Sequence, residues 1–467
     1  MTTTPRPGQS IGGGGDHPPP ASTGGRRRGI EAIEPTAALI ARLSLPSAND
    51  PAVAPLHHAD LRARTAAVAT LETAFPGLPI RRSTQATDAT TLTVGHASAD
   101  LLNAIDGEGL LQRAFQRYTY RPNIQLKLFR DKQPRGLDDL MVTSPNAYPG
   151  GRTRARPAGL AAALDDGFTV VLDGVELRDP ASVVLTGLFE RAFGCEVNVN
   201  GYLSSRTHTS FGAHWDDQEV VILQLLGRKD WTIEAPAALS MNRLAHGETV
   251  TGQTVWQGRI GPGDAVYVPR GWGHIVNGID ELTFHYTITV QRVNGLHVLD
   301  GVLADRDANP TDAERRRPLP MVPGEAAVDP LPPDPATVGQ MARRALARIR
   351  FGLTRRSTTS LRASLVALTA SELDGVLVRC PCPGGWVTVG STSPDSAPDP
   401  APSDTVIAGM AAQLVAIPRR DVAMVGDLTD GRVHDAGDAD PEVVRPLLRL
   451  GILEVVPDPT AWGLTRA

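Results

Sequence analysis

Lysine, cysteine and aromatic residues are scarce in this chain of 467 residues, and long uncharged apolar runs are absent. Three cysteines are too few for a disulfide framework, and Cys380 and Cys382 lack the spacing of a usual zinc knuckle, so we expect reduced, structural thiols. No run of about 18 uncharged apolar residues is present, and the N-terminus lacks the basic-then-apolar order of a signal peptide. These absences predict a cytoplasmic protein without a membrane segment.

The charge balance argues against nucleic-acid binding by the protein as a whole. Of 46 lysines and arginines only three are lysines, Lys127, Lys132 and Lys229, against 51 acidic residues and a formal net charge of -5. An arginine-loaded stretch near residue 350 could attract RNA or an acidic partner, although a solvated helix face near a dimer contact explains it more simply. We therefore expect no nucleic-acid partner.

Composition and apolar periodicity divide the chain into five parts. Thr, Pro and Gly dominate residues 1–29 and predict a disordered tail, and residues 30–94 contain helical patterns, one of them over 31–45. Short β-rich runs alternate with turn residues over 95–298, interrupted by one helix, which predicts an antiparallel barrel or sandwich. A Pro-rich linker over 299–335 then precedes a unit at 336–467, whose alternating helices and strands predict a winged-helix-like module.

Two histidines and an aspartate in the β-rich part suit a metal ion. His214 and Asp216 are two residues apart, so on a strand they face the same side, and His274 follows a later strand and a Pro-Arg-Gly-Trp-Gly turn. Two imidazoles and one carboxylate that leave coordination positions open are typical of non-haem Fe(II) sites, although zinc would accept the same ligands. A zinc-dependent hydrolase would also need a general base and oxyanion donors, which nothing near these residues indicates.

This order of motifs resembles the JmjC, or cupin-like, oxygenases that use Fe(II) and 2-oxoglutarate, and within them the ribosomal-oxygenase branch. The resemblance implies a mainly β fold with helices (α+β): a double-stranded β-helix (jelly-roll) core, followed by a helical segment and a winged-helix-like module. It implies His214, Asp216 and His274 as iron ligands, with 2-oxoglutarate and O2 as co-substrates. Its characterised members hydroxylate ribosomal proteins on His or Arg, and the branch carries a helical dimerisation segment, so a protein or peptide substrate and a homodimer are expected.

Four more residues take positions that the resemblance assigns to co-substrate binding. Lys229 matches the basic residue for the distal carboxylate of 2-oxoglutarate, a charge that would be costly to bury without a cation, whereas a solvated turn residue is the alternative. Asn200 matches an asparagine that holds the co-substrate, but Asn-Gly also favours tight turns. His285 and Thr289 match polar pocket positions and are explained equally well as satisfied polar groups on a half-buried strand.

The resemblance leaves the reaction and the client open. The same site serves hydroxylation and demethylation, so the ligand set does not separate the two. An oxygenase that acts on a biosynthetic peptide or small metabolite is one alternative, because the C-terminal half diverges and carries a Pro/Ser/Asp insert. A non-catalytic JmjC-like scaffold is another, although the intact ligand set with Lys229 and Asn200 speaks against it.

Overall fold

The computed structural model describes most of the chain between residues 29 and 456. The described residues are 29–85, 91–105, 109, 111, 126–137, 140–144, 152–177, 179–208, 211–236, 252–293, 297–298, 335–353, 372–381, 385–389 and 404–456. The predicted tail lies outside them apart from its last residue, as do nearly all of the predicted linker and Cys382.

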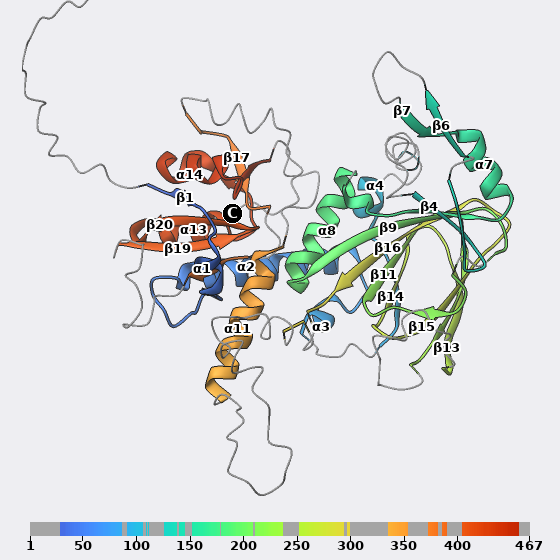
Figure 1. The fold of residues 1–467 in the computed structure, drawn as a ribbon, viewed down its shortest axis with the longest axis horizontal. Helices are drawn as coiled ribbons and strands as arrows, with labels where there is room; N and C mark the ends of the chain where they lie inside the picture. Colours follow the sequence, from blue (N-terminus) through green and yellow to red (C-terminus); the bar gives the residue numbers. More distant parts are fainter. Residues whose placement is uncertain are drawn as a thin grey trace, which may run out of the picture.

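Eight antiparallel strands in two facing four-stranded sheets form the β-helix core (Figure 1). The first sheet has the order β14 (Asp264–Val268), β11 (Glu219–Leu226), β16 (Thr283–Gln291), β9 (Glu196–Ser204). The second has the order β10 (His214–Trp215), β15 (Gly273–Gly278), β12 (Lys229–Glu234), β13 (Thr254–Ile260). This arrangement confirms the predicted jelly-roll fold.

Further strands extend the first sheet on both sides. They are β3 (Thr93–His96) beside β14, and β8 (Thr169–Leu172), β4 (Leu126–Arg130) and β5 (Gln133–Arg135) beyond β9. A separate hairpin pairs β6 (Met141–Ser144) with β7 (Arg152–Ala155). Because β3 pairs with β14, the barrel sheet includes residues ahead of position 95.

Strand β11 lies between two hydrophobic clusters. Val221 and Leu223 pack against the helix-covered core, whereas Val220 and Ile222 pack into the barrel interior against Trp231. Both faces of the strand are therefore buried, which accounts for its nearly continuous apolar sequence. The burial of apolar surface on both faces fixes the register of β11 between β14 and β16.

Helices cover the outer face of the larger sheet. They are α2 (Ala54–Ala74), α3 (Ile80–Gln85), α4 (Ala99–Ala104), α7 (Pro157–Asp165), the 3-10 turn η2 (Val175–Leu177) and α8 (Pro180–Phe193). Helix α8 begins where Asp179 Oδ2 accepts from Ser182 N at 2.9 Å, and it ends at Gly194 with φ 68°. Helix α8 packs against α2 and against the outer face of the larger sheet.

The C-terminal unit contains residues from both ends of the chain (Figure 1). Its five-stranded sheet has the order β1 (Glu31–Ile33), β20 (Gln413–Pro418), β19 (Thr405–Met410), β18 (Val387–Val389), β2 (Leu43–Ser44). A smaller sheet has the order β21 (His434–Asp435), β17 (Leu377–Arg379), β22 (Glu454–Val455). The helices are α1 (Ala37–Ala41), α11 (Pro335–Phe351), α13 (Val422–Leu428) and α14 (Pro441–Arg449), with 3-10 turns η4 (Arg419–Asp421) and η5 (Ala436–Asp438). The winged-helix character of this unit stays a prediction.

The expected helix over residues 31–45 is wrong, because this segment contains two strands and only a short helix. Pro35 cannot donate a backbone hydrogen bond, and Thr36 caps a new, short helix by accepting from Leu39 N at 3.3 Å. The residues before Pro35 instead pair with β20, and those after α1 pair with β18. Pairing with strands almost 400 residues later in the sequence is a long-range effect that local periodicity does not contain.

Candidate metal and co-substrate site

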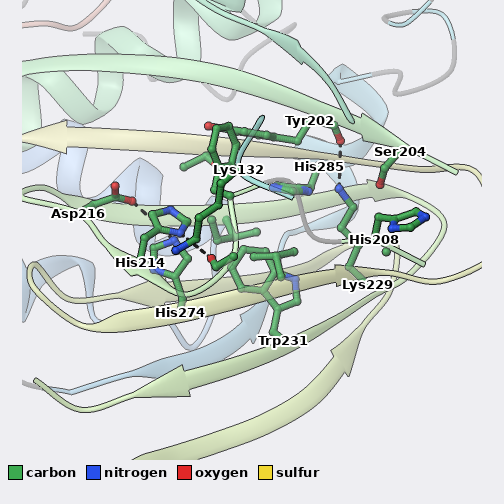
Figure 2. A pocket seen from close by; sticks show the side chains of 16 residues that line it. Lys132, Tyr202, Ser204, His208, His214, Asp216, Lys229, Trp231, His274 and His285 are labelled. Carbon is green, nitrogen blue, oxygen red and sulfur yellow. Dashed lines mark hydrogen bonds and ion pairs between the residues drawn. The ribbon is translucent and has the colours of Figure 1, made fainter. Parts of the chain in front are cut away.

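The barrel interior holds a cavity of about 410 Å³ whose walls come from both sheets. Figure 2 shows His214, Asp216 and His274 grouped at one end, Lys229 with Ser204 and His208 at the other, and aromatic side chains between. The lining residues are Lys132, Tyr202, Ser204, His208, Phe211, Gly212, His214, Asp216, Ile222, Lys229, Trp231, His274, Val276, Gly278, His285 and Thr287.

The barrel brings the three metal-ligand candidates together through one short strand pair. His214 on β10 lies directly opposite His274 on β15, and Asp216 directly follows β10, where its backbone carbonyl accepts from Gly271 N at 2.9 Å. One potential ligand atom from each of the three side chains lies within 4.8 Å of the others, and His274 Nε2 lies 3.7 Å from Asp216 Oδ2. This spacing matches three ligands around one ion.

Backbone carbonyls orient both imidazoles toward that point. His214 Nδ1 lies 3.0 Å from the carbonyl oxygen of Gly212, and His274 Nδ1 lies 3.4 Å from that of Trp272. An Nδ1–H that donates to a carbonyl leaves Nε2 with its lone pair available to a metal. Burial, together with the neighbouring His214, lowers the pKa of His274 to about 4, so this imidazole is neutral at pH 7 and suited to be a ligand.

Lys229 is buried at the opposite end of the cavity. It is 2% exposed, begins strand β12, and its Nζ donates to the carbonyl of Tyr202 at 3.3 Å. Burial lowers its pKa to about 7, and no carboxylate among the described residues pairs with it. Arg228 points the other way, where it is exposed and pairs with Glu281 at 3.1 Å. This burial is at odds with a solvated turn residue at position 229.

His285 reaches the cavity, whereas Asn200 and Thr289 are not among its described lining residues. His285 stacks on Tyr202 with ring centroids 5.0 Å apart, its Nδ1 is buried without a hydrogen-bond partner, and burial lowers its pKa well below the usual value. Asn200 lies within β9 and not in a turn, and its Oδ1 accepts from Gly174 N at 3.1 Å. Thr289 pairs with Asn198 farther along the same two strands.

Several lining residues were not predicted from the sequence. Thr287 lies between His285 and Thr289 on the same face of β16, so the strand alternation could have identified it. Tyr202 shares a face of β9 with Asn200 in the same way. No local pattern identifies Lys132, which enters from the tip of the β4–β5 hairpin and lies above the histidines in Figure 2.

Comparisons with known proteins place this site in a recognised class of domain. Residues 181–298 match the JmjC domain family, and this segment carries the three metal-ligand candidates and Lys229. No helix among the described residues is both long and apolar enough to cross a membrane.

Individual relatives confirm the resemblance to the ribosomal-oxygenase branch. The chain is 28% identical over 155 residues to bifunctional lysine-specific demethylase and histidyl-hydroxylase NO66 of Caenorhabditis elegans. This alignment covers 32% of this chain and 19% of that protein. The chain is also 31% identical over 177 residues to ribosomal oxygenase 1 of Rattus norvegicus. This alignment covers 36% of this chain and 30% of that protein. The matched segments thus span less than a third of these relatives.

A solved structure gives a related match. The structure of YcfD, a ribosomal oxygenase from Escherichia coli, in complex with cobalt and 2-oxoglutarate is 12% identical, with a TM-score of 0.45. The match covers 81% of this chain and 96% of that chain.

Proposed function

We propose that this chain is an Fe(II)- and 2-oxoglutarate-dependent oxygenase that hydroxylates a protein or peptide side chain. One observation carries the proposal: a His-Asp-His cluster and a buried lysine occupy opposite ends of one cavity inside a JmjC domain. When bound, iron and 2-oxoglutarate supply the oxidising power that inserts one oxygen atom of O2 into a C–H bond, while 2-oxoglutarate becomes succinate and CO2.

The residues present fit both groups. Two imidazoles and one carboxylate are ligands that Fe(II) accepts, and three ligands leave room for the co-substrates. An ammonium group buried without a carboxylate partner is costly, and a bound carboxylate would offset that cost. In this proposal His214, Asp216 and His274 hold iron, while Lys229 binds the distal carboxylate of 2-oxoglutarate.

The other polar residues would position the co-substrate and exclude water. His285 offers an unpartnered nitrogen next to Tyr202 and Trp231, and Thr287 adds a hydroxyl on the same wall. Asn200 and Thr289, which lie farther along the same two strands, are proposed as supporting residues beside this wall. Stacked aromatic rings keep this part of the cavity dry, which strengthens electrostatic contacts there.

We propose a ribosomal protein as the client, modified on His or Arg, because the matched relatives include a ribosomal oxygenase and a histidyl-hydroxylase. The NO66 relative is also named a lysine-specific demethylase, so demethylation is the second candidate reaction. Cytoplasmic location, a homodimer and the division into a barrel and a C-terminal module belong to the same proposal.

Mass spectrometry of the host's ribosomal proteins tests the client. Proteins from cells with and without this enzyme are compared, and the proposal expects one His or Arg residue to gain the mass of one oxygen atom only when the enzyme is present. An unmodified set of ribosomal proteins, together with a modified biosynthetic peptide or metabolite, would contradict the proposed client but not the oxygenase chemistry.

A further inference from the structure

The hairpin of β4 and β5 places one lysine in the wall of the barrel cavity. Arg130 pairs with Gln133, so Asp131 and Lys132 alone form the tip of the hairpin. Lys132 is exposed and also lines the cavity, so it lies at the rim, and Figure 2 shows its side chain above His214. The oxygenase proposal assigns no role to this hairpin.

Aromatic and cation–π contacts hold the hairpin in this orientation. The ring centroids of Phe129 and Phe211 lie 4.6 Å apart, and Phe211 itself lines the cavity. In addition, the guanidinium carbons of Arg130 and Arg135 lie 4.8 and 5.1 Å from the centroid of the Phe168 ring. Contacts from both strands of the hairpin therefore fix the direction of its tip.

The backbone of the tip does not explain why a lysine occupies it. Asp131 has φ 50° and Lys132 has φ 66°, which is the left-handed geometry of a two-residue type I′ turn. Glycine is favoured at the second position, because a residue with a Cβ is strained there. Since glycine would suit the turn better, the side chain of Lys132 and not its backbone requires an explanation.

The ammonium group of Lys132 lies beside the metal-ligand candidates. A Cβ added at Gly212 would lie 2.6 Å from Cε and 3.6 Å from Nζ of Lys132, so this side chain passes directly over Gly212. The carbonyl of Gly212 is the group that lies 3.0 Å from His214 Nδ1. Lys132 thus reaches the metal-ligand end of the cavity, whereas Lys229 is buried at the opposite end.

The ammonium group of Lys132 has no hydrogen bond or ion pair with any described residue. The neighbouring Asp131 is directed to His208, with Oδ2 3.8 Å from Nδ1. Asp216 is the one carboxylate among the described residues that line the cavity, and it belongs to the proposed metal ligands. An anionic ligand in the cavity would supply the partner that this ammonium group lacks.

We propose that Lys132 is a second cationic contact for 2-oxoglutarate and binds its keto-acid end from the rim of the cavity. This inference rests on the proposed function, in which Lys229 binds the distal carboxylate. The three rotatable N–H donors of an ammonium group can reach carboxylate oxygens in several positions, which suits a long side chain at a rim. Because Lys132 is exposed, solvent weakens the contact, and Lys132 should contribute less to affinity than Lys229.

Calorimetric titration of the full chain with 2-oxoglutarate, in the presence of Fe(II) and the absence of O2, tests this contact. Lys132→Gly should raise the Kd about 3- to 10-fold. It should leave the unfolding midpoint unchanged or higher, because glycine relaxes the turn. Lys127→Ala removes another exposed lysine of β4, which pairs with Asp173, and this matched control should keep the wild-type affinity.

A ligand without the distal carboxylate separates the roles of the two lysines. 2-Oxobutanoate has the same keto-acid end as 2-oxoglutarate but lacks the second carboxylate. Lys132→Gly should weaken the binding of both ligands by the same factor. Lys229→Ala should weaken the binding of 2-oxoglutarate and change that of 2-oxobutanoate little, because the group that Lys229 contacts is missing from it.

Two results would overturn the role of Lys132. The first is a Kd for 2-oxoglutarate that Lys132→Gly leaves at the wild-type value, because the ammonium group would then not contact the co-substrate. The second is an equal loss of affinity in Lys127→Ala, because a general effect of charge would then explain both. Failure of the proposed function is distinguishable, since the wild type itself would then bind no 2-oxoglutarate with Fe(II).

Discussion

At the scale of single residues, Lys229 has the most distinctive environment of the site. The chain uses arginine at nearly every basic position, yet a lysine occupies this buried place. A second lysine, Lys132, lines the same cavity, and the third, Lys127, forms an ion pair with Asp173 elsewhere. Two of three lysines thus lie at the site, where a compact ammonium group fits a narrow barrel better than a planar guanidinium.

Replacing Lys229 should impair the co-substrate far more than the metal. We expect Lys229→Ala to raise the Kd for 2-oxoglutarate about 10- to 100-fold, because a charge-assisted hydrogen bond is lost, while iron affinity changes little. Calorimetric titration of both ligands measures the two effects. Arg228→Ala is the matched control, since that neighbour is exposed, and equal co-substrate affinity in both variants would remove Lys229 from the site.

The lowered pKa of Lys229 predicts how co-substrate binding depends on pH. Burial sets this pKa at about 7, so the empty site carries the ammonium form below pH 7 and loses it above. Because the bound carboxylate favours the charged form, binding above pH 7 must take up a proton, and the Kd for 2-oxoglutarate should rise with pH from there. A Kd that is constant between pH 6 and 9 would contradict this environment for Lys229.

At the scale of elements, the turn between β11 and β12 controls where Lys229 points. Gly227 has φ 57°, and a Cβ added there would meet the carbonyl oxygen of Leu282 at 2.2 Å. Only glycine fits this turn without strain or a backbone shift. The turn therefore sets the register of β12, which buries Lys229 and exposes Arg228.

Gly227→Ala should lower both stability and co-substrate affinity. We expect about 1–3 kcal/mol less unfolding free energy from the strained turn and the backbone clash, measured by chemical denaturation. Gly187→Ala is the control, because a Cβ at this α8 position meets nothing within 4 Å and alanine favours helix. Equal stability of the two variants would show that the turn tolerates a side chain.

Elements were predictable from the sequence where a local pattern matched the final environment. Alternating or continuous apolar runs predicted the barrel strands, because burial on one or both faces leaves that signature. The loops that follow strands at the barrel mouth predicted where His214, Asp216 and His274 would lie. The strand that ends at Ile33 was missed, because its stability comes from pairing with β20 rather than from its own residues.

Site residues were predictable only where they belong to a sequence motif or follow the alternation of a strand. Lys132 and His208 reach the cavity from separate loops, so their placement depends on how the loops fold over the barrel. A second cavity, lined by Arg64, Arg191, Arg292 and Arg350, has the same origin, since these four arginines meet only through tertiary packing. Sequence patterns indicate local periodicity, but they do not indicate which residues from distant segments will meet in one cavity.

At the scale of the whole molecule, described segments that start at Ile30 and that end at Val456 belong to one folded unit. Ile30 is 6% exposed and packs in the core of the C-terminal unit together with Leu56 of α2. Helix α2 also continues into the core behind the barrel through Val68 and Leu71. The C-terminal unit is thus joined to the barrel by a helix that contributes to both cores.

Ile30→Ala should destabilise the C-terminal unit more than the barrel. We expect a loss of about 2–4 kcal/mol, the usual cost of a large-to-small change in a core. Hydrogen exchange should show faster exchange in β19 and β20, with barrel strands protected as before. Val255→Ala removes a side chain that is 46% exposed and serves as the control, and unchanged protection of β20 would show that the N-terminal segment adds nothing to this unit.

The most direct test of the oxygenase proposal is 2-oxoglutarate turnover by the purified chain. Conversion to succinate is measured with Fe(II) and O2, with the wild type and Asp216→Ala compared under the same conditions. The account predicts iron-dependent succinate formation by the wild type that Asp216→Ala reduces to the background of iron alone. Equal succinate formation by the two proteins, or none above background by either, would contradict it.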